Sequence, residues 1–168
     1  DEYIDVLVNN AGIVDDEIML LMEPEQWHRV VDVNLNGFFY CTRRVIEGMV
    51  MNHHGRIVNI SSAAGQMGIS GLVHYSTAKA ALIGATRSLA VELAPKHITV
   101  NAVAPGMIQT DMVRQSAEYV PEHLKDINSI PMRRLGKPEE VAYLVSFLCS
   151  NRADYISGQT IGINGGAL

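Results

Sequence analysis

A serine, a tyrosine and a lysine in this sequence have the types and spacing for acid–base chemistry at a carbonyl group. Tyr75 and Lys79 are four residues apart, so on a helix they lie on the same face. An ammonium beside the phenol favours the ionised form, so the sequence predicts a lowered Tyr75 pKa. A free tyrosine, with a pKa of about 10, exchanges protons poorly at neutral pH, and the lowered pKa would make Tyr75 a usable general acid or base. Ser62 follows the apolar run 57–60 and could donate to the same oxygen. A Tyr and a Lys at this spacing also occur on exposed helical faces, so the interpretation depends on the rest of the chain.

The composition describes an acidic chain with enough apolar residues for a core. The 168 residues carry a net charge of −5 and are 48% hydrophobic, which predicts one domain or part of one and argues against a nucleic-acid surface. No apolar run approaches the roughly 20 residues that span a bilayer, and no signal peptide is visible, so no membrane partner is expected. Cys41 and Cys149 lie in apolar helical patterns, which predicts two buried free thiols and a cytoplasmic location. We expect no metal site.

Strand-like and helix-like segments alternate along the chain, which predicts an α/β fold with a parallel sheet between two helical layers, a three-layer αβα arrangement. Apolar runs predict strands at 5–12, 56–61, 98–104 and 160–163. Helices are predicted over 24–49 with a kink near Gly37, from Tyr75 to about Leu93 and from Pro138 onward, with an irregular excursion at 107–131. The site of such a sheet lies beyond the carboxyl ends of its strands, where Ser62 falls.

Several short motifs lie at that expected sheet edge or on the helices beside it. They are Asn9–Gly12, Val33–Leu35, Ser62 followed after 13 residues by Tyr75-x-x-x-Lys79, Pro105–Thr110, Ser157–Gln159 and Asn164–Gly166. Together they resemble the motifs of the short-chain dehydrogenase/reductase family over essentially the whole chain. Within that family the chain is most similar to the reductases of 3-oxoacyl groups on acyl carrier protein. The resemblance implies the C-terminal part of a doubly wound Rossmann-type sheet.

The resemblance also implies a role for each motif residue. Tyr75 would donate a proton to the ketone oxygen as hydride arrives from the nicotinamide, and Ser62 would hydrogen-bond that oxygen. Lys79 would hold the nicotinamide ribose and lower the Tyr75 pKa, and Asn34 would hold a water between Lys79 and solvent. The residues expected to contact the cofactor are Asn10, Gly12, Tyr75, Lys79, Pro105, Gly106, Ile108 and Thr110.

Purely structural roles are open for three of these residues. Asn34 could satisfy backbone groups in a helix kink, Asn10 could form a turn, and Thr110 could cap a helix. The hydrogen-bond partners of each side chain distinguish the two kinds of role.

The glycine-rich phosphate loop of the resembled family has no counterpart in this chain. Gly65, Gly68 and Gly71 stand between a strand and a helix, but their spacing is not Gly-x-Gly-x-x-Gly and the loop is too long for that turn. The chain begins near the family's fourth strand. We therefore expect residues 1–168 to form a single partial Rossmann-type domain that lacks the first three strands and is inactive alone.

The function implied by the resemblance is an NAD(P)H-dependent carbonyl reductase that converts a 3-oxoacyl thioester on acyl carrier protein to the 3-hydroxyacyl form. NADP is the expected cofactor and NAD the alternative. Other functions left open are an inactive assembly module, a different alcohol or ketone oxidoreductase of the family, and an isomerase or epimerase. Arg56 and Lys96 are expected to dock the acidic carrier, although both could be solvated loop cations. The helices around 38–49 and 80–89 are expected to form a homodimer or homotetramer.

Overall fold

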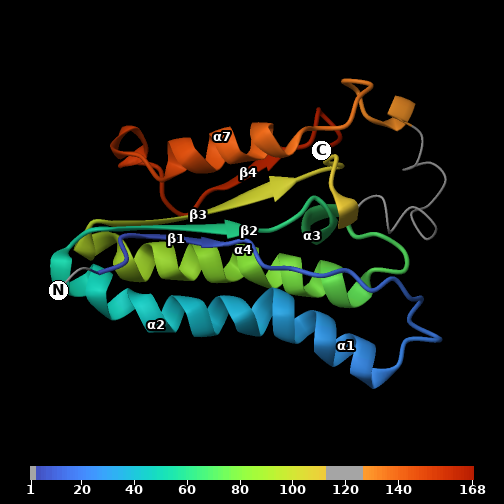
Figure 1. Ribbon diagram of the computed structural model, residues 1–168, viewed down its shortest axis with the longest axis horizontal. Helices are drawn as coiled ribbons and strands as arrows, with labels where there is room; N and C mark the ends of the chain where they lie inside the picture. Colours follow the sequence, from blue (N-terminus) through green and yellow to red (C-terminus); the bar gives the residue numbers. More distant parts are fainter. Residues whose placement is uncertain (1–2, 113–126) are drawn as a thin grey trace.

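A parallel sheet of four strands forms the centre of the fold (Figure 1). The computed structural model describes residues 3–112 and 127–168. The strands are β1 (Val6–Asn9), β2 (Gly55–Ile60), β3 (Ile98–Pro105) and β4 (Thr160–Ile163), and each pairs in parallel with the next. Every strand overlaps the run predicted for it, so the predicted parallel α/β fold is confirmed.

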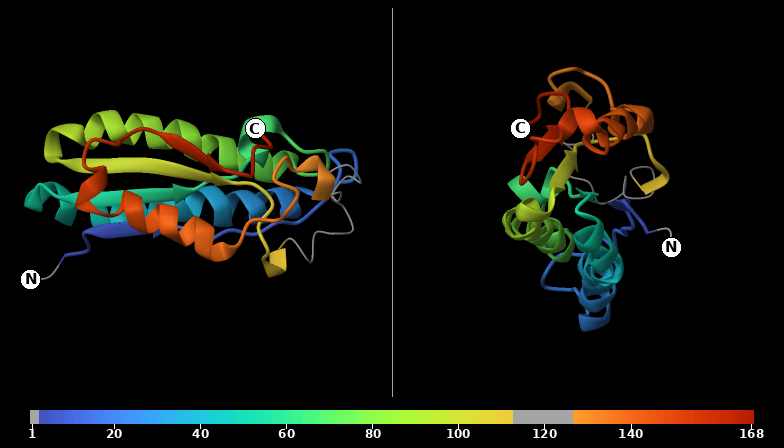
Figure 2. Two further views of the ribbon diagram at one scale, coloured as in Figure 1. Left: turned by 90° about the horizontal axis from the view of Figure 1, so that it is seen from above. Right: turned by 90° about the vertical axis from the view of Figure 1, so that its left-hand side faces the viewer.

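Helices cover both faces of this sheet and give the three expected layers (Figure 1 and Figure 2). On one side lie α1 (Pro24–Val31), the π-helical turn η1 (Asp32–Asn36), α2 (Gly37–Asn52) and α4 (Val73–Leu93); on the other lies α7 (Pro138–Leu148). The described residues also form short helical turns: α3 (Ala64–Met67), η2 (Ala94–Lys96), η4 (Ile127–Ser129) and η5 (Asn151–Ala153). The excursion predicted at 107–131 falls partly at 113–126, outside the described residues.

Neighbouring residues of β2 face opposite helical layers, as the two-residue period of a strand requires. Ile57 packs in one core with Met49 of α2 and Leu93 of α4. Val58 lies in the other core, with Leu148 of α7. Because both faces of this central strand are buried, its apolar residues Ile57, Val58 and Ile60 do not alternate strictly with exposed polar ones.

The kink predicted near Gly37 is the π-helical turn that separates α1 from α2. The Gly37 N–H bonds the Asp32 carbonyl, five residues back, where an α-helix would use a carbonyl four residues back. Asn34 is buried within this wider turn and reaches the backbone of Ile13, which follows β1. The turn therefore connects the helical layer to the carboxyl edge of the sheet.

Two histidines end helical segments in a left-handed backbone conformation. The sequence predicts Gly55 as the stop of α2, but His53 takes that position, with a φ of 51°. Gly55 instead begins β2, where a Cβ would lie 2.6 Å from the Met49 sulfur. His97 ends η2 in the same way, with a φ of 57°. The predicted glycine stop is therefore wrong, because Gly55 is needed for close packing and not for its backbone freedom.

The Arg56 side chain belongs to the interior and not to a docking surface. Arg56 is 3% exposed, and its guanidinium forms an ion pair with Asp154. Its Nη1 donates to the carbonyl of Gly55 at 2.9 Å and approaches that of His97 at 3.5 Å. The prediction that Arg56 docks an acidic carrier is therefore wrong, whereas Lys96 is half-buried and still reaches the surface.

The prediction that both cysteines are buried is wrong, since neither is fully buried. Cys41 is exposed on α2, Cys149 is half-buried after α7, and both thiols are free. Within residues 3–112 and 127–168, no helix is both long enough and apolar enough to cross a bilayer. The same described ranges hold no group of three His, Cys, Asp or Glu side chains placed to share a metal ion.

Candidate active site

The carboxyl ends of the parallel strands meet at one edge of the sheet, and the predicted site residues lie at that edge. Asn10 and Gly12 follow β1, Ser62 follows β2, and Pro105 ends β3. The first half of α4 runs beside this edge and carries Tyr75 and Lys79. The geometry thus gathers side chains from elements that are far apart in the sequence.

Tyr75 and Lys79 are both buried, one turn apart on α4. The Lys79 Nζ lies 5.5 Å from the centre of the Tyr75 ring and donates to the Ile60 carbonyl at 2.9 Å. The Ser62 hydroxyl is hydrogen-bonded to the Tyr75 phenol and accepts the N–H of Ala64 at 3.1 Å. The serine, the phenol and the ammonium that the sequence singled out are therefore neighbours.

Burial controls the proton affinity of both groups. Loss of water around the phenolate raises the pKa of Tyr75, and the hydrogen bond with Ser62 offsets this only in part. Burial lowers the pKa of Lys79 to about 8, with no described carboxylate to support its charge. The prediction of a lowered Tyr75 pKa is therefore wrong for the net shift, because desolvation of the phenol is the larger effect.

Asn34 lies against Gly12 and Lys79. Its Nδ2 donates to the carbonyls of Ile13 at 2.8 Å and Val30 at 2.9 Å, while its Oδ1 is buried without a partner among the described residues. A Cβ on Gly12 would lie 2.7 Å from this Oδ1 and 3.2 Å from the Lys79 Nζ, so only glycine leaves this space open. Asn34 does satisfy backbone groups in the π-helical turn, and it also keeps an acceptor beside Lys79.

The loop after β3 has structural contacts of its own. Gly106 packs against Asn164, where a Cβ would lie 2.8 Å from the asparagine Cβ. Ile108 is buried and pairs with Gly136 in a short parallel bridge. The Thr110 N–H bonds the Ile108 carbonyl at 2.8 Å. These contacts fix the loop beside the sheet edge but do not join it to Tyr75 or Lys79.

The two asparagines after β1 have different surroundings. Asn10 is exposed, and its N–H bonds the Val8 carbonyl at 3.0 Å, as in a turn. The Asn9 side chain, which the sequence did not single out, donates to Asn59 Oδ1 at 2.8 Å and to the Thr42 hydroxyl at 3.2 Å. Asn9 thus holds the end of β1 to β2 and α2.

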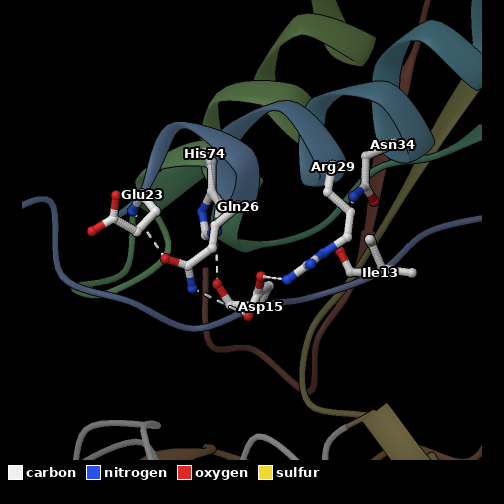
Figure 3. A network of polar contacts seen from close by, with 7 residues as sticks. All are labelled: Ile13, Asp15, Glu23, Gln26, Arg29, Asn34 and His74. Atoms are coloured by element: carbon white, nitrogen blue, oxygen red, sulfur yellow. Dashed lines mark hydrogen bonds and ion pairs between the residues drawn. The ribbon is translucent and has the colours of Figure 1, made fainter. Parts of the chain in front are cut away.

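A polar network that the sequence did not predict connects His74 of α4 to the segment after β1 and to α1 (Figure 3). His74 is fully buried, and its Nε2 bonds the Asp15 carbonyl at 2.7 Å. The Asp15 carboxylate faces α1, where it pairs with Arg29 and meets the Gln26 amide at 3.5 Å. Local periodicity gives no sign of this contact, because His74 is buried by a segment 59 residues earlier in the chain.

The fold and the site define a class of protein: a doubly wound α/β protein with a buried tyrosine and lysine at the carboxyl edge of its parallel sheet. The family described as "Enoyl-(Acyl carrier protein) reductase" matches residues 2–167. The chain belongs to the short-chain dehydrogenase/reductase family.

Several proteins are similar to nearly the whole chain. The 3-oxoacyl-[acyl-carrier-protein] reductase FabG of Aquifex aeolicus is 52% identical over 163 residues, which are 97% of this chain and 65% of the relative. The acetoacetyl-CoA reductase of Shinella zoogloeoides is 51% identical over 97% of this chain and 67% of the relative. The 3-oxoacyl-[acyl-carrier-protein] reductase of Synechocystis is 49% identical over 97% of this chain and 64% of the relative. The chain thus spans about two thirds of the length of these relatives.

Proposed function

We propose that the protein containing this chain reduces the 3-keto group of a 3-oxoacyl thioester to a hydroxyl, with Tyr75 as the proton donor. The observation that carries the proposal is the group formed by the half-buried Ser62 and the buried Tyr75 and Lys79 at the carboxyl edge of the sheet. The names of the relatives support the substrate class, since a 3-oxoacyl group on acyl carrier protein and acetoacetyl-CoA are both 3-oxoacyl thioesters.

The electrostatics of the site suit proton donation in the reductive direction. A raised pKa keeps the Tyr75 phenol protonated at neutral pH but also makes it a weaker acid, so proton transfer depends on the negative charge that develops on the ketone oxygen during the reduction. The hydrogen bond between Ser62 and this phenol supports a serine that donates to the same ketone oxygen, where charge develops. With a pKa of about 8, Lys79 is mostly charged at neutral pH and stabilises negative charge on that oxygen.

The residues around Gly12 fit a nicotinamide cofactor. The space that a Gly12 Cβ would fill lies between the unpaired Asn34 Oδ1 and the Lys79 ammonium, which suits a bound water or a sugar hydroxyl. When bound, the cofactor would supply the hydride. The proposed contacts are Asn10, Gly12, Tyr75, Lys79, Pro105, Gly106, Ile108 and Thr110. NADPH is proposed over NADH on the family resemblance alone.

The remaining proposals concern the context of the site. We place residues 1–168 in the C-terminal part of a single Rossmann-type domain, since the chain spans 65% of its Aquifex relative. Lys96 is the proposed contact for an acidic acyl carrier protein.

No described atom lies within 4 Å of a Cβ built on Gly84, so α4 is open there to a second copy in a homodimer or homotetramer. Two free thiols, one exposed, suit a cytoplasmic location.

The test uses the full-length protein with acetoacetyl-CoA and, in parallel, the 2-enoyl thioester crotonyl-CoA, each with NADPH or NADH. We expect reduction of the keto substrate, little of the enoyl substrate, and a preference for NADPH. Tyr75→Phe should lower kcat by about 10²–10⁴-fold, because it removes the proton donor and keeps the ring. Circular dichroism and the cofactor Kd should stay at the parent values.

Three outcomes would contradict the proposal. Turnover of crotonyl-CoA alone would assign the reaction named in the family description. Turnover of neither thioester would favour an inactive module or another ketone. A Tyr75→Phe variant as fast as the parent would remove Tyr75 from the chemistry.

A further inference from the structure

The segment 13–17 joins the site residue Gly12 to the exposed residues before α1, and it has no regular secondary structure. Three hydrogen bonds hold its backbone, one to the π-helical turn and two to residues at or just before the start of α4: Asn34 Nδ2 to Ile13 O at 2.8 Å, His74 Nε2 to Asp15 O at 2.7 Å, and Glu17 N to Gly71 O at 3.0 Å. Because the segment follows Gly12 directly, these bonds also limit where Gly12 can lie.

Of these three contacts, the one from His74 comes from the residue next to Tyr75, the proposed proton donor. It is the second residue of α4, directly before Tyr75, and it is fully buried. The 2.7 Å contact with a carbonyl acceptor requires the hydrogen on Nε2. The other ring nitrogen, Nδ1, is buried without a partner in the described part of the chain. The ring therefore directs a single hydrogen bond, and its target is the segment 13–17.

Asp15 connects two helices through its two polar ends (Figure 3). Its carbonyl accepts from His74 of α4, while its carboxylate pairs with Arg29 and Gln26 of α1. The neighbouring Asp16 is partly buried, which raises the pKa of its carboxyl, and its Oδ1 has no described partner. The position of the segment between the two helices thus depends on the Asp15 contacts.

We propose that His74 is a positioning residue, which holds the segment 13–17 against the start of α4 and so fixes Gly12 relative to Tyr75 and Lys79. The inference rests on the proposed function, since it gives His74 a part in the same reduction. Asp15 is three residues from Gly12, a span of at most about 10 Å. A Cβ on Gly12 would lie 2.7 Å from Asn34 Oδ1 and 3.2 Å from Lys79 Nζ, so a shift of the Gly12 backbone changes the space between these two side chains. A misplacement of about 1 Å at a site can cost about 10²-fold in rate.

The test compares three variants of the full-length protein. His74→Leu keeps an apolar volume but removes the donor to the Asp15 carbonyl. His74→Gln keeps a donor, since the glutamine Nε2 reaches about as far as the histidine Nε2. Asn101→Leu is the matched control: Asn101 is also buried, and its Nδ2 also holds a loop carbonyl at 2.7 Å, that of Ile156 before β4. His74→Asn, too short to reach Asp15, replaces His74→Leu if the latter does not fold.

Two readouts separate positioning from general stability. Hydrogen exchange of the amides of residues 13–17 reports directly on whether the segment is held. We expect at least tenfold faster exchange in His74→Leu, and parent-like exchange there in His74→Gln and Asn101→Leu. At saturating substrate and cofactor we expect kcat to fall about 10–100-fold in His74→Leu, to return within about threefold in His74→Gln, and to stay within about twofold in Asn101→Leu at a similar loss of Tm.

Unchanged exchange in His74→Leu would overturn the inference, as would a parent-like kcat despite faster exchange. An equal loss of kcat in Asn101→Leu, or no rescue by His74→Gln, would assign the effect to stability and also overturn it. If the parent protein reduces no 3-oxoacyl thioester, the proposed function fails, and with it the catalytic part of this inference. The exchange measurement then still decides whether His74 holds the segment.

Discussion

Two buried cations lie at opposite ends of β2, and their surroundings differ. Arg56 and Lys79 are each 3% exposed. Arg56, at the amino end of the strand, has a carboxylate partner in Asp154 and a backbone carbonyl at 2.9 Å. Lys79, at the carboxyl end, has the Ile60 carbonyl at 2.9 Å and a pKa lowered to about 8 by burial. The amino end of β2 therefore carries a charge that the fold neutralises, whereas its carboxyl end contacts a charge on α4 that has no described carboxylate partner.

The difference separates structural burial from functional burial. An ion pair with added hydrogen bonds offsets the cost of removing Arg56 from water. For Lys79 that cost is left largely uncompensated, which is a feature typical of functional sites. A buried polar atom without a described partner occurs at both ends, Arg56 Nε at one and Asn34 Oδ1 at the other, so the unpaired charge of Lys79 is what distinguishes the carboxyl end. Comparison of the two ends thus indicates the carboxyl edge as the site without reference to any motif.

The largest expected effect is on activity, from Lys79→Met in the full-length protein. Loss of the ammonium should lower kcat/KM by about 10²-fold or more, since it removes a charge that stabilises the transition state. Tm should change by only a few degrees, because relief from burying an unpaired charge offsets the lost bond to Ile60. Steady-state kinetics and thermal unfolding of the same preparation provide the check. A large loss of Tm with kcat intact would reverse the comparison.

The next effect is on stability, from Asp154→Asn at the other end of β2. Arg56 would stay buried without its carboxylate, and the free energy of unfolding should fall by about 1–2 kcal/mol. This figure is at the low end for a buried pair, because the Asp154 side chain is 61% exposed. Denaturant titration gives the loss, and kcat at saturation should stay within about twofold.

The control for this variant is the double substitution R56M/D154N, which removes the buried charge together with its partner. It should recover part of the lost stability. A tenfold lower kcat in Asp154→Asn with unchanged unfolding would show that the amino end also serves the reaction.

The last effect is the contribution of Lys79 to the pH dependence of stability. Its pKa is about 8 in the folded state, against an unfolded value of 10.5, so between these values the unfolded chain binds more protons. The folded state should therefore gain stability as pH rises from 8 to 10, by at most about 1.4 kcal/mol per pH unit. The measured quantity is the unfolding free energy of the parent minus that of Lys79→Met, in which other groups cancel. A flat or falling difference would mean that Lys79 keeps its ordinary pKa.

Local patterns were sufficient for the strands and for the positions of Ser62, Tyr75 and Lys79 in the fold. The spacing of Tyr75 and Lys79 follows from the helical period, and the place of Ser62 follows from the rule that strand ends share an edge. Each of these inferences needs only a few neighbouring residues. They therefore hold without knowledge of how distant segments pack.

Residues whose surroundings come from distant segments could not be predicted. Arg56 precedes an apolar run, and its position in the sequence predicts an exposed loop cation. In the structure it is buried and forms an ion pair with Asp154, 98 residues later. His74 reads as a polar residue in the first turn of a helix, although the segment after β1 covers it. The prediction of a lowered Tyr75 pKa is wrong for the same reason. Neighbouring residues bury the phenol, and this loss of water, and not the lysine alone, determines its pKa.

The π-helical turn at Asp32–Asn36 sets the rotation of α2 about its axis relative to α1. A regular helix advances by about 100° per residue, so one residue fewer in this turn would rotate α2 by about that angle relative to α1. Val50 would then take the core position that Met49 now fills against Ile57. The extra residue lets α1 meet Asp15 and lets Asn34 meet Gly12, while α2 keeps its own alignment with the sheet.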